Sequence, residues 1–92
     1  MSESDLSKMR SVDQDAFVKI TERTESYGTD TPAWRLMSVD AMFGGIIYKT
    51  DRARVTKDLY KKYDDLLDSI NYLRFVGVLV KEELERQKPK ST

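Results

Sequence analysis

The chain contains no cysteine and no histidine among its 92 residues. It therefore forms no disulfide, and thiolate nucleophiles, Cys/His zinc sites and imidazole-based catalysis are all excluded. Any metal ion must be held by oxygen ligands, which favours Mg²⁺ or Mn²⁺. The function classes left open are oxygen-ligated metal chemistry, phosphate binding and protein association.

Long apolar runs and a targeting signal are also missing. The longest apolar run, residues 73–80, includes Arg74 and is far too short to cross a bilayer. The N-terminus is polar and acidic, unlike a signal peptide. We therefore expect a cytoplasmic protein that has no membrane partner.

The net charge is zero, with 16 basic and 16 acidic residues, but the charge is unevenly spread. Residues 31–62 carry seven bases against three acids. A local basic excess of this kind suits phosphate groups. It is too modest for a duplex nucleic-acid binder, so nucleic acid is the least favoured partner.

The sequence predicts an all-α fold, with residues 1–92 as one domain and with flexible tails over 1–10 and 88–92. Apolar residues make up 39% of the chain and charged residues 35%, as in a small helical protein. Helix-start signals and apolar periodicity predict three main helices. They run from about Asp5 or Ser11 to Ser26, from the N-cap Ser38 to about Arg54, and from Thr56 or Asp58 to about Gln87. A short turn through Trp34 and Leu36 is expected between the first two.

The last helix is unusually long, on the order of 40 Å. Its apolar residues follow near-heptad spacing, which is typical of helices that pack on one another. They are Tyr63, Leu66, Ile70, Leu73, Gly77, Val80 and Leu84. Residues 75–80 are also apolar almost all round. These features predict a small helical bundle that assembles as an oligomer.

A Gly44-Gly45 pair lies inside the second helix, where each glycine costs roughly 1 kcal/mol relative to alanine. Such a pair indicates either close approach of another group or a local kink. The sequence leaves both open.

Three carboxylates, Asp64, Asp65 and Asp68, lie within five residues of the third helix. Like charges one turn apart repel, so something positive is expected beside them. With Asn71 they form an oxygen-rich group that suits a divalent cation. The alternative is neutralisation by basic side chains, with Lys61, Lys62, Arg74, Arg52 and Arg54 as candidates.

Basic and aromatic residues supply candidate nucleotide contacts. Lys49 and Arg52 share a helix face with Arg54 close by, and they could neutralise phosphate charge. They could equally be surface charges or partners of the aspartates. Trp34, Tyr27 and Tyr72 are candidates for stacking on a base, and the alternative is packing in the core.

Several motifs resemble those of phage and bacterial MazG-like proteins, especially the small branch associated with nucleotide modification. They are Tyr27-Gly28, Trp34-Arg35-Leu36-Met37-Ser38, Asp40, Lys49-x-x-Arg52 and Asp64-Asp65-Leu66-Leu67-Asp68-x-x-Asn71-Tyr72. The resemblance implies an all-α dimer or tetramer that hydrolyses nucleoside triphosphates to monophosphate and pyrophosphate with Mg²⁺. It implies that Asp65 and Asp68 act as the metal-binding catalytic pair, with Asn71 next along.

The chain departs from this family on the second helix. Active members carry glutamates there in a Glu-Glu-x-x-Glu pattern, whereas residues 46–52 contain none. Half of the usual metal cage is therefore missing, so a pyrophosphohydrolase here would have a degenerate metal site. A reduced site could also bind nucleotide without cleaving it.

Two functions follow from the sequence. The first is a MazG-like protein that binds, or hydrolyses, a nucleoside phosphate with Mg²⁺ or Mn²⁺. The second is a non-catalytic, oligomeric helical adaptor or inhibitor, phage-encoded, that acts through protein–protein contacts.

Overall fold

The computed structural model describes residues 1–27 and 33–88, excluding the side chains of residues 23–27 and 33. The described elements are all helical: α1 (Glu3–Tyr27), the 3₁₀ turn η1 (Ala33–Leu36), α2 (Val39–Val55) and α3 (Leu59–Gln87). The predicted all-α class, the three main helices and the long last helix are confirmed. Residues 3–10, which were expected to belong to a flexible tail, lie in α1.

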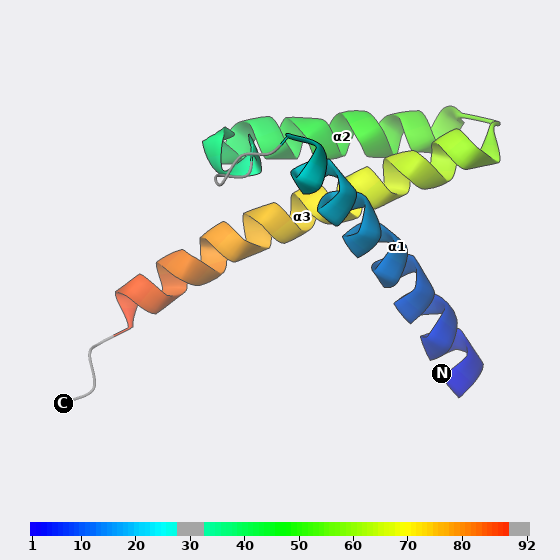
Figure 1. The fold of residues 1–92 in the computed structure, drawn as a ribbon, viewed down its shortest axis with the longest axis horizontal. Helices are drawn as coiled ribbons and strands as arrows, with labels where there is room; N and C mark the ends of the chain where they lie inside the picture. Colours follow the sequence, from blue (N-terminus) through cyan, green and yellow to red (C-terminus); the bar gives the residue numbers. More distant parts are fainter. Residues whose placement is uncertain (28–32, 89–92) are drawn as a thin grey trace.

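The helices α2 and α3 form an antiparallel pair, and α1 crosses α3 (Figure 1). The tight connection between α2 and α3 comes from two caps. The N–H of Thr56 donates to the Arg52 carbonyl at 2.9 Å and closes α2. The Asp58 carboxylate then accepts from the N–H groups of Tyr60 and Lys61 and opens α3.

The predicted N-cap of α2 is also confirmed, because the Ser38 hydroxyl accepts from the Ala41 N–H at 3.0 Å. One of the two glycines in α2 is explained by a close approach. A Cβ at Gly45 would lie 3.0 Å from the ring of Tyr72, whereas a Cβ at Gly44 would meet nothing within 4 Å. Tyr72 of α3 therefore packs directly on the backbone of α2.

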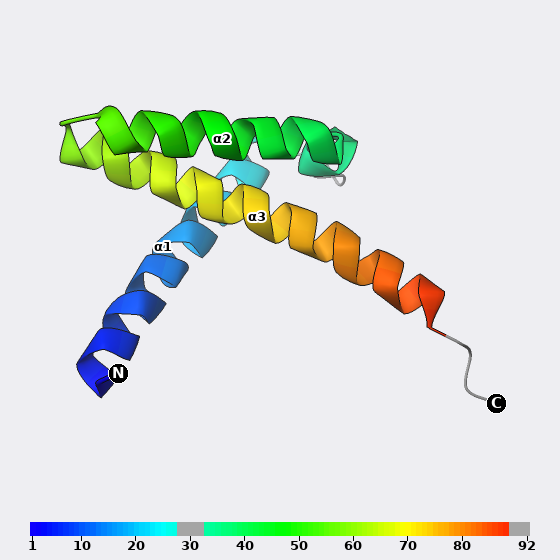
Figure 2. The ribbon, with the colours of Figure 1, turned by 180° about the vertical axis from the view of Figure 1, so that it is seen from behind.

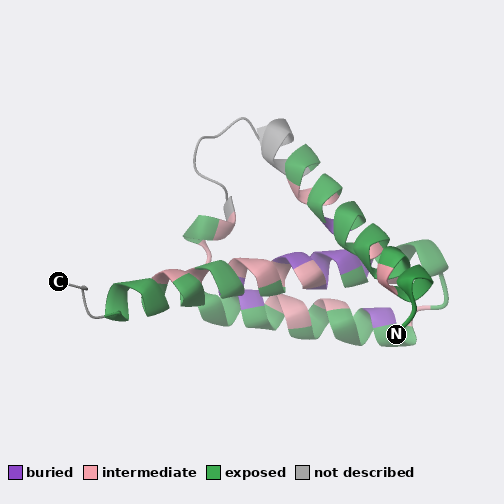
Figure 3. Cartoon of the chain, turned by 90° about the horizontal axis from the view of Figure 1, so that it is seen from below, coloured by how far each residue is buried: buried purple, intermediate pink, exposed green. Residues whose placement is uncertain are grey.

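The described core is small and unusually polar. Its buried apolar residues are Ala16, Met42, Ala53, Leu67 and Val76. Nearly as many polar residues are buried, and all of them lie in the first half of α3: Asp65, Asp68, Ser69 and Asn71. Figure 3 shows this buried zone where the three helices meet, and the exposed last turns of α3.

The chain is extended for its size. Its radius of gyration is 15.9 Å, whereas about 12 Å is typical of a compact domain of this length. The first turns of α1 and the last turns of α3 both project away from the other helices (Figure 1). No described helix is long and apolar enough to cross a membrane. The predicted oligomer stays a prediction.

Candidate functional site

The three aspartates of α3 converge where α1, α2 and α3 meet. One carboxylate oxygen from each of Asp64, Asp65 and Asp68 lies within 4.8 Å of the others. This follows from helical geometry, because residues three and four apart share one face. Asp65 and Asp68 are only 1% and 5% exposed, whereas Asp64 is open to solvent.

Arg52 of α2 binds Asp65 through two hydrogen bonds. Its Nε donates to Oδ2 at 2.8 Å and its Nη2 donates to Oδ1 at 2.5 Å. The hydrogen bond from Arg52 lowers the pKa of Asp65 and outweighs the opposing effect of burial. The Arg52 guanidinium also contacts Tyr48, whose hydroxyl accepts a hydrogen bond from Nη1 at 3.1 Å.

Asp68 lies between two lysines from different helices. The Nζ of Lys19 on α1 is 2.6 Å from Oδ1, and the Nζ of Lys49 on α2 is 2.8 Å from Oδ2. Burial acts to raise the pKa of Asp68, but the hydrogen bonds from Lys19 and Lys49 lower it by more. The same contact with Asp68 raises the pKa of Lys49.

Lys19 also neutralises the exposed member of the cluster. Its Nζ lies 2.5 Å from Asp64 Oδ1 and donates to the Asp64 carbonyl at 3.3 Å. The three acids are thus matched by three bases, and the cluster carries no net charge. We call these six residues the ionic cluster: Lys19, Lys49, Arg52, Asp64, Asp65 and Asp68.

The sequence reasoning named Lys49 and Arg52 but missed Lys19. Lys19 is 45 residues from Asp64 in the chain, and no local pattern points to a pairing over that separation. Two of the other proposed partners of the aspartates, Arg54 and Arg74, pair with different acids. Arg54 pairs with Asp51 at 2.9 Å, and Arg74 pairs with Asp13.

Asn71, predicted as a fourth metal ligand, anchors α1. Its Nδ2 donates to the buried Ala16 carbonyl at 3.1 Å, and its Oδ1 accepts from Arg74 Nη1 at 3.1 Å. The Arg74 guanidinium in turn lies 4.1 Å from the ring centre of Phe17. Asn71 and Arg74 therefore fasten α1 across α3.

Two of the three predicted base-stacking residues pack against the ring of Phe75. Trp34 stacks on Phe75, with 4.8 Å between ring centres and 2° between planes. Tyr72 meets the same ring edge-on at 6.2 Å. On the outside of Trp34 lies Arg35, which also pairs with Glu82 at 2.8 Å. The side chain of Tyr27 lies outside the described residues.

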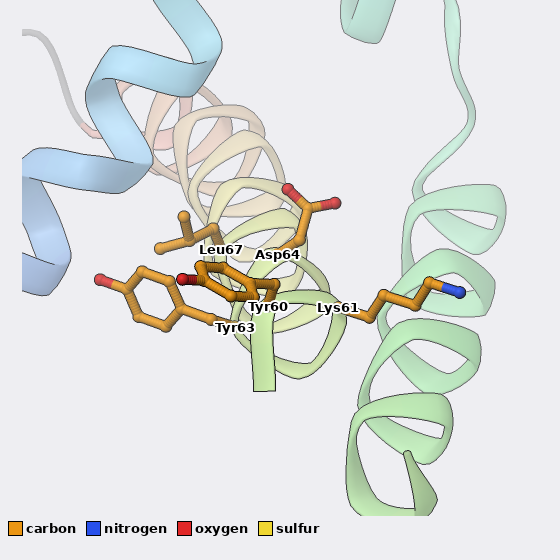
Figure 4. A pocket seen from close by; sticks show the side chains of 5 residues that line it. All are labelled: Tyr60, Lys61, Tyr63, Asp64 and Leu67. Carbon is orange, nitrogen blue, oxygen red and sulfur yellow. The ribbon is translucent and has the colours of Figure 1, made fainter. Parts of the chain in front are cut away.

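A shallow hollow lies beside the ionic cluster, at the start of α3 (Figure 4). Tyr60, Lys61, Tyr63, Asp64 and Leu67 line it. Of the three aspartates only Asp64 reaches it. Tyr63 closes one side, where its hydroxyl donates to Asp15 of α1 at 2.6 Å. The two buried aspartates do not line this hollow and are paired with their bases.

Comparison of the chain with protein-family models, with curated proteins and with solved structures finds no match. The resemblance to MazG-like proteins stays a hypothesis.

Proposed function

We propose that this chain is a non-catalytic helical protein that acts by associating with other polypeptides. The observation that carries this proposal is the ionic cluster. Lys19, Lys49 and Arg52 already supply the positive charge that the aspartates require. A cation that bound Asp65 and Asp68 would have to displace the partly exposed bases that already neutralise these two buried carboxylates.

The surface supports an associating role. Large apolar side chains are exposed on all three helices, including Phe17, Phe43, Ile47 and Leu73. Only five of the described apolar residues are buried, so this core alone provides little hydrophobic stabilisation for a chain of this length. Association with another apolar surface would remove that deficit.

A second candidate is Mg²⁺-dependent nucleotide binding or hydrolysis of the MazG-like kind. It is favoured by the convergence of three carboxylates next to three bases. Magnesium could bind Asp65 and Asp68, with Asp64 at the edge, while Lys49 and Arg52 turned to the phosphates. The cluster would have to open, because the same atoms are now paired with one another.

One assay separates the non-catalytic candidate from a nucleotide-hydrolysing enzyme. Pyrophosphate release would be measured for a panel of canonical and modified nucleoside triphosphates, with Mg²⁺, with Mn²⁺ and with chelator. An associating protein gives no release above buffer, and Asp68→Ala behaves in the same way. Metal-dependent release that Asp68→Ala abolishes would establish the second candidate and remove the first.

A further inference from the structure

One side of the α2–α3 pair has no described element against it. Seen from behind, α2 and α3 face the viewer and α1 passes behind them (Figure 2). Helical geometry identifies the residues on this side, at 100° per residue. Asp64 and Asn71 are both bound to α1. Leu66 and Leu73 each come two residues later in α3, a rotation of about 200°, and therefore point nearly opposite to α1.

The same reasoning extends to α2. Phe43 is nine residues from Arg52, so it lies on the opposite side of α2 from Arg52. The apolar residues on this side of both helices form what we call the outer face: Val39, Phe43, Ile47, Leu66, Ile70, Leu73, Gly77, Val80 and Leu84. All six of its α3 members belong to the heptad series, and no charge interrupts that series between Leu66 and Leu84.

The outer face is large enough to bind a partner. Seven of its side chains are between 39% and 68% exposed. At roughly 150–200 Å² for a fully exposed residue of this size, they present about 540–710 Å² of mainly apolar surface. This area is at or above the upper end of the range for the largest patch of a typical monomer, about 300–600 Å². It approaches the ~800 Å² that each partner contributes to a stable interface.

Charge at the edges indicates which partner fits. Contacts between Gly45 and Tyr72 and between Arg52 and Asp65 set the register of α2 against α3. In this register Asp40 lies level with Gly77, one turn from Lys81. Asp40 is at the edge of the outer face that is farther from α3, and Lys81 is at the edge that is farther from α2. When two such faces stack about a twofold axis parallel to the helices, α3 lies over α2 of the other copy, and these opposite charges meet.

We propose that the outer face binds a second copy of this chain, with α3 of each copy packed on α2 of the other in a four-helix bundle. This deepens the proposed function by identifying one of its partners. A twofold dimer needs only one self-complementary face, and antiparallel helices of this kind pack well in bundles. Gly77, beside which a Cβ would meet nothing within 4 Å, lets the helices approach closely in the middle of the face.

The test is sedimentation equilibrium of the full chain and two matched variants. Leu73 on the outer face is 53% exposed, and Val78 on another side of α3 is 38% exposed. Leu73→Lys should raise the dimer dissociation constant at least about a hundredfold, because a charge enters an apolar interface. Val78→Lys should change it less than about threefold. The proposal would be overturned if the native chain were still monomeric at about 100 µM. It would also be overturned if the two variants changed the dissociation constant equally.

Two further measurements keep the proposal testable if Leu73→Lys does not fold. The melting temperature of the native chain should rise with protein concentration, as for any protein stabilised by self-association. Lys81→Glu should weaken the dimer, and adding Asp40→Lys should restore part of the loss. A concentration-independent melting temperature, or a dimer that this double reversal weakens further, contradicts the stated pairing.

Failure of this proposal is distinguishable from failure of the proposed function. A monomer that releases no pyrophosphate would remove the second copy but leave a non-catalytic associating protein. A dimer that hydrolyses nucleotide would keep the interface and remove the non-catalytic role.

Discussion

The two sides of α3 invert the usual distribution of charge and apolar surface. The side toward α1 and α2 buries Asp65, Asp68 and Asn71, each held by a partner from another helix. The outer side exposes an unbroken apolar series that includes Leu66, Leu73 and Leu84.

The two sides of α3 have different roles: one sets how the helices align, and the other is available for association. Buried ion pairs add little net stability, because desolvation offsets their attraction, but a mismatched pair is costly. We infer that the ionic cluster fixes the register of α1, α2 and α3. Burial of apolar surface is what stabilises most folds, and here much of that surface is left for association. The predictions below test this comparison.

Acid should have the largest effect, because it removes every carboxylate charge of the inner side together. The folded-state pKa values of Asp65 and Asp68 lie below their ordinary value of 3.8. Their ionisation therefore stabilises the fold above about pH 4, and this contribution is lost as pH falls through the folded-state values. Urea unfolding across pH 7 to 2 should show a plateau followed by a steep loss of stability. The variant Asp65→Asn/Asp68→Asn should flatten that dependence, and an unchanged slope would contradict the assignment.

A second prediction concerns alkaline pH. Hydrogen bonding to Asp68 raises the pKa of Lys49 above 10.5, and hydrogen bonding to Asp15 raises that of Tyr63 above 10.0. Both contributions are present below those values and are lost as pH rises through the folded-state pKa. The plateau should therefore extend to about pH 10, as measured by unfolding at each pH.

Replacing one buried acid should have the next largest effect. Asp65→Ala should lower the free energy of unfolding by about 2–3 kcal/mol, somewhat below the ~3–5 kcal/mol typical of broken buried pairs, because Arg52 can turn toward solvent. The matched control is Asp51→Ala, which breaks the exposed pair with Arg54 and should cost less than about 0.5 kcal/mol. Similar losses for both variants in urea unfolding would show that the inner side has no special role.

Replacing each of the two adjacent glycines by alanine should change stability by a smaller amount, and the two changes should differ in sign. Gly44→Ala should stabilise the chain by up to about 1 kcal/mol, because alanine favours the helix and the added methyl meets nothing. Gly45→Ala brings its methyl against the Tyr72 ring, so overpacking should cancel or exceed that gain. Thermal unfolding of both variants measures the difference. Equal stabilisation would mean that Tyr72 does not hold α2 against α3.

The sequence predicted the elements better than it predicted their contacts. Ser38 and Asp58 are local capping signals, and the heptad series is a local pattern, so the helices and the long α3 followed directly. The acidic triad was also visible as a cluster that needed positive charge. The bases beside it could not all be predicted, because the pairing of Lys19 with Asp64 and Asp68 requires α1 to cross α3. The hydrogen bond of Asn71 could not be predicted for the same reason, because its partner is a backbone carbonyl of α1.

The central claim is that the chain's own bases take the place of a metal on the inner side of α3. It is tested most directly by Mg²⁺ titration of thermal stability in the native chain and in Lys19→Ala/Lys49→Ala, with ionic strength held constant. The account predicts no Mg²⁺ dependence in the native chain. In the variant, three acids face Arg52 alone, and Mg²⁺ at tenfold its dissociation constant should restore about 1.4 kcal/mol. A saturable rise in the melting temperature of the native chain, abolished by Asp68→Asn, would contradict the account.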